Sequence, residues 1–163
     1  MDRWNVLPSG VEELDEALVG QPYEWLSNFP NEKKDMSNAL SAYKKKNYGE
    51  VIGNCYNAVE GISRIALNNK STLDKNIKPF REKLSLSEQW TSFLNNFYHY
   101  ANTAKRHADE GRHELDPAEI EAYLYLTGIF LRLASQKLDP ETSGASSTSK
   151  LLTVNFRIGK THT

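Results

Sequence analysis

The chain contains very little cysteine and no long apolar run. Cys55 is the single cysteine among its 163 residues, so no disulfide can form within the chain. This usage favours a reducing compartment, and the place of Cys55 in an apolar helical pattern indicates a structural thiol. No apolar segment reaches the ~20 residues that span a bilayer, and the N-terminal segment lacks the basic and then apolar pattern of a signal peptide. We therefore expect a cytoplasmic protein without membrane contact.

A strong excess of one charge sign is also absent. The net charge is −1, although residues 1–35 hold 8 acidic and 3 basic side chains and the rest of the chain holds 13 acidic and 17 basic ones. The body of the chain thus has a mild positive excess. Such an excess is compatible with RNA binding, but it is far below the basic stripe that identifies a nucleic-acid binder by charge alone.

Helix-breaking residues are concentrated near the N-terminus, where residues 1–31 hold three of the six prolines. We predict an irregular leader over residues 1–31, with one short helix around residues 11–18. Its aromatic residues Trp4, Trp25 and Phe29 are better explained as anchors on the body than as a ligand surface.

The body and the tail differ in composition. Residues 32–138 are predicted to form one helical domain, whereas residues 139–163 begin with a Ser/Thr/Gly-rich segment typical of a flexible tail. This tail carries Lys150, Arg157 and Lys160, so contact between the tail and RNA stays an alternative.

Apolar residues of the body recur at helical spacing. We predict helices over 32–47, over 52–66 after a break at Tyr48-Gly49, within 73–84 with an interruption at Pro79, over 87–104, and over 116–137. The last begins with an N-cap aspartate, a proline at the first helical position and a carboxylate three residues after the cap. The fold class is therefore all-α, an up-and-down bundle of four to five helices.

The last predicted helix is apolar on more than one side. Its apolar residues cannot all face one side of a monomeric bundle, so either the leader or a second subunit should cover it. We favour a homodimer. The residues concerned are Ile120, Tyr123, Leu124, Leu126, Ile129, Phe130, Leu131 and Leu133.

The polar segment from Lys105 to His113, which the pattern places in a loop between two apolar helices, carries two Arg–His pairs. An imidazole moves protons near neutral pH, and a guanidinium holds phosphate oxygens in a planar fork. The combination favours chemistry on phosphate esters. The alternative is a solvated loop whose cations lie near the C-terminal carbonyls of the preceding helix.

Other kinds of site are less favoured. His99, His107 and His113 have no cysteine or carboxylate at a tight metal-ligand spacing, Cys55 lacks the surroundings of a nucleophile, and no Gly-rich phosphate loop occurs. Asn57, Glu60 and Arg64 form a polar stripe that either faces solvent, which we favour, or lines a site. Tyr98 is better placed than Tyr100 to stack on bases, because Tyr100 belongs to an apolar stripe.

Arg106 and His113 are separated by six residues, and the polar His107 follows the arginine. An apolar helix precedes the two residues and a capped apolar helix follows them, and this arrangement resembles the HEPN superfamily. The signature of that family is the same Arg-to-His spacing, commonly with a polar residue such as Asn, Asp or His directly after the arginine. Residues 100–130 also look like the HEPN domain that ends some abortive-infection proteins. The resemblance covers about residues 32–138.

The resemblance implies a metal-independent endoribonuclease of a prokaryotic defence or toxin system, active as a homodimer and needing no cofactor. It implies that Arg106 and His113 are catalytic. His107 and Asn102 would support the scissile phosphate, and Lys105 and Arg112 would add positive charge to the shared cleft.

The resemblance also leaves alternatives open. Many members of the family are noncatalytic, so the alternative function is a HEPN-type dimerisation module that binds RNA or protein. Some family toxins carry a tyrosine two residues after the motif histidine as the target of a partner enzyme, and Leu115 stands there instead. That arrangement is disfavoured, while another regulatory protein partner stays compatible with the sequence.

Overall fold

The computed structural model describes residues 24–109 and 115–138, without the side chains of 107–109. This part of the chain is all-helical, as predicted. Its helices are α2 (Pro30–Lys44), α3 (Tyr48–Leu67), α4 (Leu73–Lys83), α5 (Gln89–Asp109) and α6 (Pro117–Leu138).

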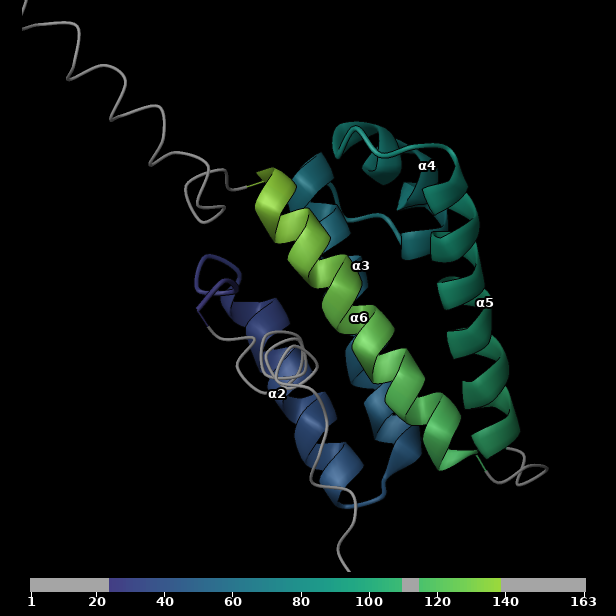
Figure 1. Cartoon of the computed structure of the whole chain (residues 1–163). Coiled ribbons are helices and arrows are strands. Elements are labelled where there is room, and N and C mark those ends of the chain that lie inside the picture. Colours follow the sequence, from purple (N-terminus) through teal and green to yellow (C-terminus); the bar gives the residue numbers. More distant parts are fainter. Residues whose placement is uncertain (1–23, 110–114, 139–163) are drawn as a thin grey trace, which may run out of the picture.

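The helix α3 occupies the centre of the bundle and packs against each of the other four described helices. In Figure 1, α6 lies in front of α3, with α2 along one side and α5 along the other, and α4 crosses one end. This arrangement explains why α3 buries residues on several sides, among them Val51, Ile52, Cys55, Val59 and Ile62.

The N-terminal anchors predicted at Trp25 and Phe29 are confirmed. Both side chains are buried, together with Leu26, and the Arg132 guanidinium of α6 lies 5.5 Å from the centre of the Trp25 ring. Such cation–π contacts favour a fixed ring position. Trp4, the short helix expected near residues 11–18 and the tail 139–163 lie outside the described residues.

Two predicted interruptions of helices, at Tyr48-Gly49 and at Pro79, are wrong. Tyr48 and Gly49 do not break the pattern but form the first turn of α3, and the chain reverses just before them, where Lys46 adopts a positive φ of 59°. Pro79 does not interrupt α4. The hydrogen bond that its missing N–H removes is one of several in the helix, and burial of Ile77 and Phe80 on the inner face holds α4 together.

The start of α6 follows the predicted capping pattern in part. The Asp116 carboxylate accepts a hydrogen bond from the Ala118 N–H at 2.9 Å, which satisfies a free donor of the first turn. Glu119 does not return to the cap. Its carboxylate instead accepts a hydrogen bond from the Tyr100 hydroxyl of α5 at 3.2 Å.

Neighbouring helices of the same chain cover most of the apolar surface of α6. Ile120, Tyr123, Leu124, Phe130 and Leu131 are all buried, and Leu126 and Leu133 are half-buried. Ile129 stays 39% exposed. A second subunit therefore has less of α6 to cover than the sequence pattern indicated.

One carboxylate lies inside the bundle. Glu32 of α2 is only 4% exposed and packs on Gly61 of α3, where a Cβ atom would overlap its Oε1. Its Oε2 atom has no hydrogen-bond partner among the described residues, and burial raises its pKa. Gly61 is thus needed for the close approach of α2 to α3.

Candidate functional site

The structure corrects the position of the basic segment. Lys105 and Arg106 do not lie in a loop but in the last turns of α5, which continues to Asp109. The apolar stripe ends at Ala104, and the helix predicted from that stripe therefore ends there too. No residue between Lys105 and Asp109 breaks a helix, and the alanine, lysine and arginine there favour one. The arginine is therefore held on a regular backbone.

The exposed side of this helix end borders a polar cavity of about 550 Å³. It lies on the surface opposite the buried stripe of Leu94, Phe97, Ala101 and Ala104. The lining residues are Tyr98, His99, Asn102, Thr103, Lys105 and Arg106.

Four of the seven predicted site residues thus share one cavity, namely Tyr98, Asn102, Lys105 and Arg106. Three of them, Asn102, Lys105 and Arg106, are exposed. The side chain of His107, together with Arg112 and His113, lies outside the described residues. The pairing of Arg106 with His113 therefore stays a prediction.

The cavity has the electrostatics of an anion site. Its cations are Lys105 and Arg106, and none of the described residues that line it is acidic. A guanidinium and an ammonium one residue apart on a helix can contact neighbouring oxygens of one phosphate or two successive phosphates. Asn102 and Thr103 add neutral hydrogen-bonding groups one turn earlier.

The Tyr98 ring packs against Tyr56 of α3. Its ring centre lies 6.3 Å from that of Tyr56, whose hydroxyl donates a hydrogen bond to the Glu60 carboxylate at 3.0 Å. Burial, with Glu60 close by, raises the pKa of the Tyr56 hydroxyl. Tyr56 therefore keeps its proton and its hydrogen bond at neutral pH, and the ring behind Tyr98 keeps its position.

Glu60 is itself held in place by the connection between α3 and α4. It forms an ion pair with Arg64 at 2.7 Å and accepts a hydrogen bond from the Leu73 N–H at 2.9 Å. The Arg64 Nε donates to the Ser71 carbonyl at 2.8 Å. Two residues of the predicted polar stripe thus form structural contacts rather than simply facing solvent, whereas Asn57 is exposed.

The sequence analysis missed two residues of the cavity, His99 and Thr103. A signal was available, because His99, Asn102, Thr103 and Arg106 follow the three-and-four spacing of one helix face. A loop after Ala104 would separate Arg106 from this face, so the spacing has meaning only when α5 continues to Asp109.

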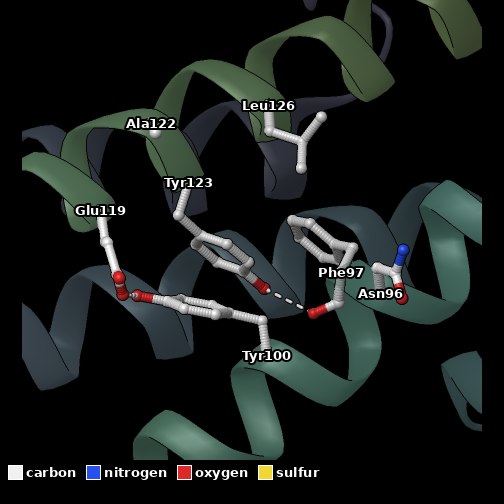
Figure 2. A pocket seen from close by; sticks show the side chains of 7 residues that line it. All are labelled: Asn96, Phe97, Tyr100, Glu119, Ala122, Tyr123 and Leu126. Atoms are coloured by element: carbon white, nitrogen blue, oxygen red, sulfur yellow. Dashed lines mark hydrogen bonds between the residues drawn. The ribbon is translucent and has the colours of Figure 1, made fainter.

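A second hollow of about 330 Å³ lies between α5 and α6 and is almost wholly apolar (Figure 2). Its floor is built from Phe97 and Tyr123, whose rings stack 4.5 Å apart, and the Tyr123 hydroxyl donates to the Phe97 carbonyl at 3.4 Å. Tyr100 and Glu119 close one end, and burial beside Glu119 raises the pKa of Tyr100 to about 12. The hollow suits an apolar contact and not a phosphate.

Among the described residues, no group of three or more His, Cys, Asp or Glu side chains is arranged to hold a metal ion. None of the helices in this part of the chain is long and apolar enough to cross a membrane. Burial raises the pKa of the Cys55 thiol to about 12, in keeping with a structural role. No protein-family model matches the chain, and neither the curated proteins nor the solved structures compared with it give a match.

Proposed function

We propose that the protein is a metal-independent endoribonuclease of the HEPN type, acting as a homodimer in a prokaryotic defence or toxin system. The observation that supports this function is the polar cavity on α5. It gathers Arg106, Lys105 and Asn102 on one exposed helix face, with no acidic side chain among the described residues that line it. A polyanionic ligand fits this surface better than a cation or an apolar molecule.

The proposed reaction is transesterification at a ribose. The 2′-oxygen attacks the adjacent phosphorus as it loses its proton, the bond to the 5′-oxygen of the next nucleotide breaks, and that oxygen gains a proton. The products are a 2′,3′-cyclic phosphate and a 5′-hydroxyl. His113 moves the proton, and Arg106 stabilises the additional negative charge on the phosphorane-like transition state.

The helical position of Arg106 suits this role. A side chain on a regular helix is held more precisely than one on a loop, so its guanidinium meets the phosphate with less loss of conformational freedom. In the proposed dimer, the basic ends of two α5 helices meet, and the positive potential of the cleft doubles.

The second copy would cover apolar groups that the single chain leaves exposed. Phe93 of α5 is 51% exposed and Ile129 of α6 is 39% exposed. The Trp90 ring lies 5.3 Å from Phe93 and 6.0 Å from Phe130, which places Phe93 on the side of α5 that faces α6. Because this side of α5 lies away from the cavity, Phe93 and Ile129 offer surface for association with a second copy but do not themselves support the shared cleft.

The apolar hollow of Figure 2 supports a second candidate function, a noncatalytic module that dimerises or binds a protein partner. Such a module would bind RNA at the polar cavity without cleaving it. The two functions differ in one measurable property, the appearance of new RNA ends.

The test is incubation of the purified protein with mixed single-stranded RNA in excess EDTA, beside Arg106→Ala, His113→Ala and Lys78→Ala variants. Lys78 is an exposed cation on α4, away from the cavity, so its variant controls for a general loss of positive charge. We expect the wild type and the Lys78 variant to produce 2′,3′-cyclic phosphate ends and the other two variants to lose activity by 10²-fold or more.

Equal cleavage by all four proteins would reveal a contaminating nuclease and contradict the proposal. RNA binding without cleavage by a wild-type dimer would favour the noncatalytic module. Light scattering on the same samples tests the dimer, and a monomer that still cleaves would remove the shared cleft from the proposal.

A further inference from the structure

We propose that Tyr98 and His99 form a nucleobase subsite beside Arg106, so that the ligand is a single RNA strand bound along α5 over several nucleotides. The inference rests on the proposed function, because it places this base next to the phosphate held by Arg106. It adds a residue, His99, to which the motif and its spacing assign no role.

The first observation is the length of the polar surface. His99 and Arg106 are both exposed, and both line the same cavity. They are seven residues apart, which is about 10.5 Å along a helix. That distance is roughly three times the 3.4 Å rise per nucleotide of a stacked strand. A phosphate at Arg106 therefore leaves room for two or three nucleotides toward His99.

The second observation is an aromatic pair at the far end of this surface. The rings of Tyr98 and His99 lie 5.2 Å apart and meet edge to face, at 68°. Tyr98 is half-buried, whereas His99 is exposed. The His99 ring is therefore the platform on which a base can stack, and the Tyr98 ring forms a wall at the edge of that platform.

The third observation is the support behind this wall. Tyr56 lies against Tyr98 from α3, and Glu60 and Arg64 hold Tyr56 in place through the contacts described above. Because the Tyr98 ring is already held in position, it loses little conformational entropy when a base binds beside it.

The chemistry of the cavity decides the class of ligand. An aromatic platform at one end and two cations at the other match the alternation of base and phosphate in a single strand. A duplex would hide its bases from the platform. Asn102 and Thr103 lie between the two ends and offer hydrogen bonds to a phosphate oxygen or a base edge.

The test uses a short fluorescent RNA that is fully 2′-O-methylated and so resists cleavage, together with a set of copies that each lack one base. Fluorescence anisotropy gives the affinity of each copy. We expect one abasic position to weaken binding to the wild type by about 5- to 100-fold, the range measured for one stacked base.

The variants assign that position to the platform. In His99→Ala the intact RNA should bind more weakly by a similar factor, and the abasic position should no longer matter. His99→Phe keeps an aromatic face and should restore both the affinity and the abasic effect. Lys78→Ala is the control and should bind like the wild type. His99 is exposed, so its substitution leaves the core intact.

The outcomes separate this inference from the proposed function. An abasic series with no sensitive position, or a sensitive position that persists unchanged in His99→Ala, would overturn the subsite even if the wild type cleaves RNA. Absence of cleavage with an abasic effect that depends on His99 would support the subsite and contradict the nuclease. Failure of the wild type to bind this RNA overturns the subsite.

Discussion

The contact between Glu32 and Gly61 gives a sharp test of how α2 packs on α3. We consider Gly61→Ala, which adds one methyl group where the Glu32 carboxylate lies. In an unobstructed helix interior, replacing glycine by alanine stabilises a protein by about 1 kcal/mol. Here the carboxylate is buried, and the new Cβ would also lie only 3.3 Å from the Glu32 Cδ.

The sign of the effect follows from comparing two terms. Forcing an extra methyl into a packed contact costs about 1–3 kcal/mol, which cancels or exceeds the gain in helix propensity. We therefore expect Gly61→Ala to be neutral or destabilising by up to about 2 kcal/mol. Gly53 provides a matched control in the same helix, because a Cβ there would meet nothing within 4 Å. Gly53→Ala should stabilise the protein by about 1 kcal/mol.

Urea unfolding of the wild type and both variants, followed by circular dichroism, measures the difference. A difference of about 2 kcal/mol corresponds to about 4–8 °C in Tm for a chain of this size. Removing the carboxylate should reverse the sign, so Gly61→Ala made in a Glu32→Ala protein should stabilise it. Equal stabilisation by Gly61→Ala and Gly53→Ala in the wild type would refute the packing of Glu32 on α3.

Two further predictions concern buried ionisable groups. Burial raises the pKa of Glu32 above its usual 4.5, so the folded state binds this proton more tightly than the unfolded state does. The contribution of Glu32 to stability therefore falls as pH rises from 4.5 through the folded pKa. Glu32→Gln should accordingly gain stability relative to wild type at pH ~7 but not at pH ~4, as chemical unfolding at both values would measure, and an equal gain at both would contradict the argument. The Cys55 thiol is buried and its pKa is raised to about 12, so iodoacetamide should label it only after unfolding, which intact mass measurement would show; rapid labelling of the folded protein would contradict its burial.

Helical periodicity predicted the all-α fold well, because burial of an apolar stripe determines where a helix forms. It failed at helix ends, which depend on features that the stripe does not report. At Pro79 the loss of one hydrogen bond is outweighed by the burial of Phe80. After Ala104 the helix continues because no residue breaks it, although Lys105 and Arg106 are exposed and polar and so do not extend the apolar stripe.

The candidate site shows the same division. The sequence predicts Arg106, Asn102 and Lys105 around one phosphate and Tyr98 as a ring beside them, and the structure places all four on one cavity. Their grouping depends on α5 extending past Ala104, the end of the predicted helix, to Asp109. Tyr56 could not be predicted as a support for Tyr98, because contact between α3 and α5 depends on how the two helices cross.

The contacts around Glu60 bear on how the length of this chain can vary. Surface connections between helices usually accept insertions and deletions with little effect. The connection of residues 68–72 is different, because Ser71 and the first residue of α4 are bonded to the same Glu60 and Arg64 that hold the ring behind Tyr98. A residue added to or removed from this short segment would shift those bonds and reach the α5 surface, so this is one of the places where related chains should keep their length.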